Sequence, residues 1–456
     1  MGTSPDKKNS DHIVVIGGGW AGCAAAVRLA QAGRRVSLFE SSRTLGGRAR
    51  RVEIDGRTLD NGQHILLGAY RATLKMMKTV GLDADETLLR LPLQMRYPAH
   101  TDGMDFIAPR LPAPLHVLLA LIKAKGLTRD DKMALARFST TARWMGWQLY
   151  EDCSVAELLE RYEQTERLTR LMWAPLCIAA LNTPPQRASA QVFLNVLRDS
   201  LGARRAASDM LIPRTDLTSL FPQHAAAFVE RCGGDVSCGH TVDSITSPQA
   251  GSDASSASGR WQIRFKQNDQ PASFDGVVIA TGPEAATDLL EGISDTTSLR
   301  ALDYEPITTC YLQYPAQVRL DQPFYALLDD PEQAAWGQFV FDRGQLSVGN
   351  TADVGLFAVV VSAAGDAIAQ GHAALTEGIT TQLAQQLHNP LLKTPLWSKV
   401  ISEKRATFSC TPGLLRPDNT GMPPGLALAG DYVAGDYPAT LEAAAQSGIK
   451  AAELFL

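Results

Sequence analysis

The chain has 456 residues, more than one ordinary hydrophobic core serves, and this length indicates two domains or more. Its residues are 45% hydrophobic and 20% charged, as in globular proteins, and its net charge of −5 argues against nucleic acid or another polyanion as a partner. The longest candidate apolar segment, Val117–Ile122, is far shorter than the roughly 18 residues that span a bilayer, which excludes a transmembrane helix.

The first elements along the chain form a βαβ pattern. Residues 12–16 predict a short apolar strand, residues 21–32 a helix of small side chains, and residues 35–39 a second strand. The unit is about 30 residues long, which is the size of a mononucleotide-binding half.

The turn inside this unit carries the chemistry. Gly-Gly-Gly-Trp-Ala-Gly follows the first strand: Gly17 permits the tight turn, Gly19 lets the backbone approach a pyrophosphate, and Gly22 allows close helix–strand packing. The phosphate would then meet free N–H groups and the positive end of the helix dipole. Glu40 ends the second strand and is placed to accept hydrogen bonds from ribose hydroxyls, which favours FAD or NAD over NADP.

A second motif distinguishes FAD from NAD. Leu-Gly-Gly-Arg at 45–48 follows Glu40 closely and resembles a segment of the amine-oxidase and carotenoid-desaturase flavoproteins. This resemblance implies that Gly46 and Gly47 let the backbone pass near the flavin and that Arg48 meets the pyrophosphate.

The next part of the chain is mainly helical. Residues 70–80 predict a helix, and the stretch from about 85 to 210 predicts amphipathic helices separated by prolines. Ser154 and Glu157 form a capping box at the start of one of them, 154–161. Three aromatic residues in this region have the spacing either of a wall of an apolar tunnel or of ordinary core residues: Trp144, Trp147 and Tyr150.

One helix in this region has a membrane-surface pattern. Residues 111–125 combine an apolar body with Lys123 and Lys125, and Arg110 and Arg129 lie nearby. Such a helix either lies in a membrane interface, where it would collect a lipid substrate, or packs on the core of its own domain.

The second half of the chain returns to alternating strands and helices. Its predicted elements are a helix at 221–232, strands within 235–245 and 261–266 around a loop at 247–259, a strand at 275–280, mixed β structure with one helix (365–388) between 300 and 410, a strand at 426–428, and a helix from about Thr440.

These elements predict an α/β fold. We expect strands 12–16, 35–39, 235–240, 275–280 and 426–428 to share one sheet of an FAD-binding Rossmann-like domain of the glutathione-reductase type. That domain would comprise residues 1–80, 215–298 and 405–456. An inserted, mixed α+β substrate domain would comprise residues 81–214 and 299–404.

Later motifs agree with this class of flavoprotein. Residues 277–283 resemble its second strand-and-turn signature, Leu-Ala-Gly-Asp at 428–431 resembles the motif whose aspartate binds the ribityl chain, and Val242 matches the position that pairs with adenine. The helix that starts after 438 could face the flavin with its N–H groups. The expected cofactor-binding residues are Gly17, Gly19, Trp20, Ala21, Gly22, Glu40, Gly46, Gly47, Arg48, Gln63, His64, Val242, Thr281, Gly282, Gly430, Asp431, Ala439, Thr440 and Leu441; no metal ligands are expected.

The source of electrons and the cellular location are indicated by what the sequence lacks. There is no second glycine turn for NAD(P)H and no redox cysteine pair, so electrons must come from the organic substrate or from an external donor. The seven cysteines are scattered, and residues 1–11 lack a targeting pattern. We therefore expect a cytoplasmic protein, with or without peripheral contact to the inner membrane; its oligomeric state stays open.

A narrower resemblance is carried by three segments. Residues 60–70 (DNGQHILLGAY), 110–116 (RLPAPLH) and 438–442 (PATLE) resemble the hydroxysqualene dehydroxylase family of bacterial hopanoid synthesis. The resemblance runs from about residue 12 to the end. It implies reduction of the C30 isoprenoid hydroxysqualene to squalene by reduced FAD. The alternatives are a phytoene-type isoprenoid desaturase, a flavin amine oxidase with Tyr432 and Tyr437 as the only cage candidates, and a non-catalytic flavoprotein.

The proposed chemistry needs an acid. The hydroxyl is allylic, so protonation and loss of water leave a delocalised cation that hydride from flavin N5 can quench. His64 can donate a proton near neutral pH, or it can simply bond the backbone beside the cofactor. Asp60 and Asp216 are the other catalytic candidates. The alternative for Asp60 is that it fixes a turn or binds backbone, and the alternative for Asp216 is that it is structural or exposed.

Overall fold

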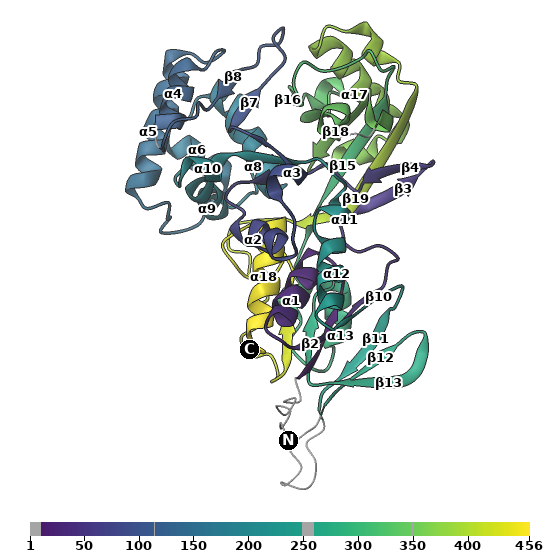
Figure 1. Cartoon of the computed structure of the whole chain (residues 1–456). Helices are drawn as coiled ribbons and strands as arrows, with labels where there is room; N and C mark the ends of the chain where they lie inside the picture. The colour runs from purple at the N-terminus through teal and green to yellow at the C-terminus, as the bar shows by residue number, and fades with distance from the viewer. Residues whose placement is uncertain (1–10, 114, 249–259, 348–350) are drawn as a thin grey trace, which may run out of the picture.

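The computed structural model describes residues 11–113, 115–248, 260–347 and 351–456. Figure 1 shows a lower part built around a parallel sheet, and above it a helical lobe on the left and a β-rich lobe on the right. Among the described residues, no helix combines the length and apolar character needed to cross a bilayer.

The lower part contains a parallel sheet of five strands. They are β10 (Asp235–Cys238), β2 (Arg35–Glu40), β1 (His12–Ile16), β14 (Gly276–Ile279) and β20 (Leu426–Leu428), in that order. The prediction that five separate chain segments share one sheet is confirmed. These strands are almost entirely apolar at the centre of the sheet because both faces are covered.

Helices cover one face of this sheet and a small sheet covers the other. Ile13 and Val15 pack with α1 (Trp20–Gln31), α12 (Pro222–Arg231) and α18 (Leu441–Glu453), whereas Val14 and Ile16 pack toward β12 (Trp261–Phe265). The alternation follows from the two-residue period of a strand.

The predicted strand region 235–245 is divided between two sheets. β10 ends at Cys238, and β11 (Val242–Thr246) pairs antiparallel with β12, which in turn pairs with β13 (Asn268–Phe274). Gly239, with a φ of +76°, stands between the two strands and lets the chain change direction. Residues 249–259 of the predicted loop lie outside the described part of the chain.

The β-rich lobe has an antiparallel sheet of five strands: β16 (Phe324–Ala326), β17 (Phe339–Asp342), β18 (Leu356–Ser362), β15 (Tyr304–Gln313) and β19 (Trp397–Phe408). The helix predicted over 365–388 is split into α16 (Gly365–Ala369) and α17 (His372–Gln386). Gly371 between them has a φ of +83°, which a continuous helix does not allow.

The helical lobe confirms the expected change of pattern. Its main elements are α4 (Leu115–Lys123), α5 (Arg129–Trp144), α6 (Val155–Arg161), α7 (Glu166–Leu168), a π-helical turn (Thr169–Trp173), α8 (Ala174–Leu181), α9 (Ala190–Ser200) and α10 (Arg205–Ser208). The capping box of Ser154 and Glu157 is present at the start of α6.

The aromatic residues of this lobe do not form the expected wall. Trp144 is 88% exposed and Tyr150 fully exposed, so both alternatives, tunnel and core, are wrong for these two. Trp147 alone is partly buried, beside α9.

Short elements connect the parts. They are β3 (Arg51–Ile54), β4 (Arg57–Asp60), β5 (Leu66–Leu67), α2 (Arg71–Thr79), α3 (Ala84–Thr87), β6 (Leu88–Leu91), β7 (Gln94–Arg96), β8 (Asp105–Ile107), β9 (Met210–Pro213), α11 (Leu217–Leu220), α13 (Pro283–Leu290), α14 (Thr297–Arg300) and α15 (Arg343–Leu346). β5, β9 and β6 form a small antiparallel sheet in that order. The domain boundaries at 80, 214, 298 and 404 remain a prediction.

Candidate functional site

The glycine turn lies between β1 and α1, as its spacing predicts. Gly17 has a φ of +106°, and a Cβ there would lie 2.6 Å from the carbonyl oxygen of Ala280. A Cβ on Gly22 would lie 1.9 Å from the carbonyl oxygen of Gly17. Gly19 is the N-cap of α1 and has no side-chain cap, and its Cβ position is open to within 3.7 Å. The first N–H groups of α1, starting at Trp20 and Ala21, are therefore left for an outside ligand.

The Gly-Gly-Arg segment lies directly beside this turn. Gly46 N donates to the carbonyl oxygen of Gly18 at 2.9 Å, and Gly19 forms an isolated bridge with Gly46. Gly47 also approaches Gly19 closely. Two motifs recognised separately in the sequence thus form one glycine-lined cradle.

Glu40 fixes the end of β2 against the same turn. Its Oε2 accepts from Gly18 N at 2.7 Å, and its Oε1 accepts from Ser42 N at 2.8 Å. The side chain is 8% exposed. Each carboxylate oxygen has a second lone pair, so the group can hold the turn and still accept from a ribose hydroxyl.

Arg48 and Asp431 meet although they are far apart in sequence. Arg48 Nη2 donates to Asp431 Oδ1 at 2.5 Å, and its Nη1 donates to the carbonyl oxygen of Ala406 at 2.6 Å. The resemblance assigned these side chains to the pyrophosphate and the ribityl chain, respectively. In the structure they form one ion pair, in which Arg48 stays 38% exposed and Asp431 10%.

The remaining predicted motifs follow strands β14, β20 and β10 of the parallel sheet. Tyr432 links the two signatures, because its hydroxyl donates to the carbonyl oxygen of Thr281 at 3.0 Å, next to Gly282. Gly430 N donates to Ser447 of α18. Val242 begins β11, two residues after His240, whose N–H donates to the carbonyl oxygen of Glu40 at the end of β2.

The N-terminus of α18 is held by an N-cap residue, Thr440, and by bonds from Glu442 to α2. Thr440 is its N-cap and accepts from Ala443 N at 3.1 Å, which puts Ala439 and Leu441 at the helix start. Glu442 is fully buried and accepts from Ala72 N, Thr73 N and Thr73 Oγ1, all at 2.8–2.9 Å. The helix start is therefore held against the N-terminus of α2, a role that the sequence did not reveal for Glu442.

These observations fit FAD. The glycine cradle, the uncapped start of α1 and the carboxylate of Glu40 suit the ADP half, and the Arg48–Asp431 pair and the start of α18 suit the rest of the cofactor. No cluster of three or more metal-ligating side chains occurs in the described part of the chain.

Segment 60–64 is hydrogen-bonded to the Gly-Gly-Arg segment and the residues that follow it. Asn61 Nδ2 donates to the carbonyl oxygen of Arg48 at 3.0 Å, and Asn61 N donates to that of Arg50 at 2.8 Å. His64 Nδ1 lies 3.0 Å from the carbonyl oxygen of Gly62 and must donate to it, since a carbonyl only accepts. The other ring nitrogen, Nε2, has no partner among the described residues.

The surroundings of His64 favour its neutral form. Burial lowers its pKa below the ordinary 6.5, the bond to Gly62 opposes this shift, and the positive charge of Arg48 lowers the pKa further. In the neutral form Nε2 is an acceptor. Thr309 is 1% exposed and lies near Gly62, and its hydroxyl has no described partner either, so two unpaired polar atoms flank this turn.

Asp60 belongs to a buried charge cluster. Its Oδ1 accepts from Leu217 N at 2.8 Å, and its Oδ2 lies 3.4 Å from Nη1 of Arg343. The same guanidinium donates to Gln63 Oε1 at 3.0 Å and faces Asp353 at 3.8 Å. Burial raises the pKa of Asp60 to about 6 although Arg343 opposes the shift.

The contacts of the two aspartate candidates match their structural alternatives. Asp60 binds backbone and Arg343 in the interior, at 2% exposure. Asp216 is the N-cap of α11 and accepts from Thr218 N and Ser219 N. His64 Nε2 has no described partner, whereas each aspartate holds at least one backbone N–H group through its Oδ1. Sequence reasoning missed Arg343, whose surroundings carry no local motif.

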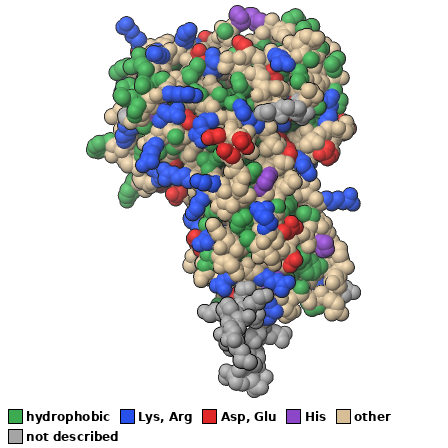
Figure 2. Space-filling model, viewed as in Figure 1, with side chains coloured by type: hydrophobic (Ala, Val, Ile, Leu, Met, Phe, Trp, Pro, Cys, Tyr) green, Lys and Arg blue, Asp and Glu red, His purple; other side chains and the backbone are tan. Residues whose placement is uncertain are grey.

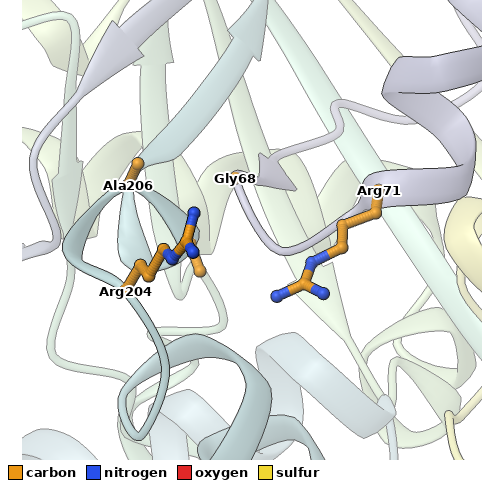
Figure 3. A pocket seen from close by; sticks show the side chains of 5 residues that line it. Gly68, Arg71, Arg204 and Ala206 are labelled. Atoms are coloured by element: carbon orange, nitrogen blue, oxygen red, sulfur yellow. The ribbon is translucent and has the colours of Figure 1, made fainter.

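A hollow of about 340 Å³ lies next to Gly68, near the end of segment 60–70. It is lined by Gly68, Arg71, Arg204, Ala206 and Ala207, and the two arginine side chains extend into the space between them (Figure 3). Neither guanidinium pairs with a carboxylate of the described residues. The hollow is therefore cationic.

Comparison with known proteins agrees with this geometry. The model of the family described as flavin-containing amine oxidoreductase matches residues 20–456. The chain is 28% identical to a hydroxysqualene dehydroxylase of Rhodopseudomonas palustris, covering 98% of this chain and 99% of the relative. It is 26% identical to one of Sinorhizobium fredii, covering 98% of each.

Solved structures share the fold. A protein described as a putative protoporphyrinogen oxidase from Exiguobacterium matches with a TM-score of 0.68 at 17% identity, over 98% of each chain. Cyclohexylamine oxidase from Brevibacterium oxydans matches with a TM-score of 0.65 at 17% identity, also over 98% of each chain.

Proposed function

Because the chain belongs to the flavin-containing amine oxidoreductase family and is an FAD-dependent oxidoreductase, we propose that it reduces hydroxysqualene to squalene. The full-length similarity to hydroxysqualene dehydroxylases supports this substrate. The structural observation that carries the proposal is the attachment of segment 60–64, which bears the narrower resemblance, to the Gly-Gly-Arg segment through Asn61.

The overall reaction exchanges hydroxyl for hydrogen. A proton reaches the allylic hydroxyl oxygen, the C–O bond breaks, water leaves, and the resulting carbocation receives hydride. Reduced FAD, when bound, supplies the hydride. An allylic system delocalises the positive charge, so the chain must mainly bind the substrate, exclude competing water and deliver one proton.

His64 is the residue that we propose for the proton. Its Nδ1 is committed to Gly62, so a second proton can sit only on Nε2, and that nitrogen has no described protein partner. Because its pKa is lowered, the imidazolium holds this proton weakly and is a strong donor, although few molecules carry it at neutral pH. Asp60 stays a positioning candidate through Arg343 and Gln63.

Electrons are proposed to come from a separate donor. The parallel sheet carries the FAD-type glycine turn, and the other sheets of the described residues are antiparallel. A second nucleotide-binding βαβ unit therefore does not occur among the described residues.

The amine-oxidase alternative has less structural support. An aromatic cage needs two free tyrosine faces, but Tyr432 is 2% exposed and bonds Thr281. The hydroxyl of Tyr437 donates to Asp199 Oδ2 at 2.5 Å. The hydroxyl groups of both tyrosines are therefore hydrogen-bonded within the protein.

The decisive experiment is anaerobic. The flavin of the holoenzyme is photoreduced, hydroxysqualene is added, and the return of oxidised-flavin absorbance is followed together with the product mass. Stoichiometric flavin oxidation with squalene formed is expected. No reoxidation, together with bleaching of the oxidised enzyme by a polyene precursor or an amine, would instead establish a desaturase or an amine oxidase.

A further inference from the structure

The outer face of α4 exposes large apolar side chains. Leu115 is 52% exposed, Leu118 49% and Ile122 60%, and their spacing of three and seven residues puts them on one side of the helix. The opposite side, with His116 and Ala120, is buried. Exposing neighbouring apolar side chains to water is unfavourable, so such a cluster usually marks a binding surface.

The apolar face continues onto α5. Lys132 Nζ donates to the carbonyl oxygen of Ile122 at 2.9 Å, which brings the start of α5 against the end of α4. Met133, next in the chain, is 61% exposed. We call Leu115, Leu118, Ile122 and Met133 the α4–α5 face.

Unpaired basic residues surround this face. They are Arg110, Lys123, Lys125 and Arg129, all exposed. None of these four side chains forms an ion pair with any residue that the structure describes. Figure 2 shows hydrophobic and basic side chains side by side over the part of the surface where α4 and α5 lie in Figure 1.

The local charge is opposite to that of the whole chain. Between residues 107 and 144 there are seven lysines and arginines but two aspartates, a net charge of +5, whereas the whole chain has a net charge of −5. Of the aspartates, Asp131 is buried in the capping box of α5. The positive charge is therefore concentrated where the apolar side chains are exposed.

We propose that the α4–α5 face docks on an anionic lipid surface. Leucine, isoleucine and methionine side chains would enter the acyl boundary while the lysines and arginines meet lipid phosphates, the division of roles found in interfacial helices. Exposed Trp144 and Tyr150, at and beyond the end of α5, have the amphipathic rings that favour a headgroup layer.

Docking there fits the delivery of an apolar substrate, a point that rests on the proposed function. The helical lobe would meet the lipid, and the parallel sheet lies at the far end of the molecule (Figure 1). His116 of α4 bonds Ser208 of α10 at 3.1 Å, and Ala206 and Ala207 of α10 line the hollow beside Arg71. The helix that carries the docking face thus contacts α10, two of whose residues line the hollow next to Gly68.

The test is vesicle flotation of the full-length holoenzyme. The vesicles are phosphatidylcholine alone or phosphatidylcholine with phosphatidylglycerol. The double variant Leu118→Glu/Ile122→Glu removes the apolar contact, and Lys123→Ser/Lys125→Ser removes two charges. Leu391→Glu/Leu396→Glu is the matched control, because these leucines are 64% and 70% exposed and lie just before β19 of the β-rich lobe. Bound flavin absorbance verifies folding of each variant.

We expect wild type and control to float with the anionic vesicles, and the double Glu variant to stay in the soluble fraction. The charge variant should bind about 25-fold more weakly, about fivefold per basic residue, with a smaller dependence on salt. Wild type that stays soluble with both vesicles would overturn docking, as would a double Glu variant that floats normally. A change of sedimentation from dimer to monomer in that variant would reassign the face to a second copy of the chain.

Docking and the proposed function fail separately. The double Glu variant should turn over detergent-dispersed hydroxysqualene at the wild-type rate and lose rate only when the substrate is supplied in vesicles. If wild type floats with the vesicles but does not turn over hydroxysqualene, the docking proposal is supported and the dehydroxylase proposal is refuted.

Discussion

At the scale of single residues, the site depends on which polar atoms are already committed. His64 uses Nδ1 for Gly62 and has no described partner for Nε2, whereas Asp60 and Asp216 each hold backbone N–H groups through Oδ1. A residue type alone does not distinguish these cases. The partners of each atom do, because a committed atom cannot transfer a proton without breaking its own bonds.

His64→Gln is expected to retain FAD and to slow dehydroxylation about 100-fold or more, the usual size of a general-acid contribution. Because the pKa of His64 lies below 6.5, the wild-type rate should rise as pH falls, since the imidazolium fraction grows. The variant should lack this rise. Single-turnover flavin oxidation measured across pH tests both points, and an unchanged rate would exclude His64 from the mechanism.

Arg343→Leu is expected to destabilise the protein by about 3–5 kcal/mol, because it leaves the buried carboxylate of Asp60 without its cation. Burial already raises the pKa of Asp60 from 3.8 to about 6, and loss of Arg343 should raise it further. When folding raises the pKa of an acid, its contribution to stability is fully present below the pKa of the unfolded state. That contribution is lost as the pH rises through the pKa of the folded state.

The Arg343→Leu variant should therefore be closest to wild type near pH 4 and weakest above pH 7, measured by urea unfolding of the holoenzyme. Arg300→Leu is the control, because its ion pair with Glu291 at 4.0 Å is exposed and should matter little. A pH-independent loss of stability would contradict the assignment to Asp60.

At the scale of elements, the start of α18 is positioned by a different helix. Glu442 satisfies two backbone N–H groups and a hydroxyl at the start of α2, so the two helices hold each other. Carboxylates are favourable at helix N-termini because the N–H groups there lack intrahelical partners. The arrangement also holds segment 60–70, which ends at α2, near the cofactor region.

Glu442→Ala should cost about 2 kcal/mol or more, because it leaves those three donors unsatisfied in the interior. Glu442→Gln keeps the shape and one acceptor oxygen, so it should recover part of the loss. Thr73→Val removes one of the three bonds and should have the smallest effect. Urea unfolding of the three variants gives the order, and an Ala variant as stable as wild type would refute the anchoring role.

At the scale of the whole molecule, the cofactor region is assembled from distant pieces of chain. The glycine turn, the Gly-Gly-Arg segment, the turn after β14 and the start of α18 come from residues 17–48, 281–282 and 430–441. A ligand that contacts all of them stabilises the folded chain by linkage.

Removal of FAD is therefore expected to lower the unfolding midpoint, and adding FAD at about 100 times its Kd should restore about 2.7 kcal/mol. The measurement is thermal unfolding of apoprotein titrated with FAD, with NADP as the control ligand, since the carboxylate of Glu40 disfavours a 2′-phosphate. Equal midpoints with and without FAD would contradict a cofactor bound across these segments.

The sequence alone determined the elements and the cofactor class. Period-two apolar runs and the spacing from Gly17 to Glu40 are local patterns, so they predicted the βαβ unit and the five strands of the parallel sheet. The capping box at Ser154 is equally local. Local signals also predicted an apolar, basic helix at 111–125. They did not decide whether it lies in a membrane interface or packs on the core of its own domain.

Only the tertiary structure decided which distant groups meet. Arg48 pairs with Asp431 across 383 residues, Glu442 with Thr73 across 369, and Arg343 with Asp60 across 283. Charged residues carry no periodic pattern that names their partners, because pairing depends on where folded elements come together. The exposure of the α4 leucines and of Trp144 was decided in the same way, since burial is a property of neighbours and not of the segment itself.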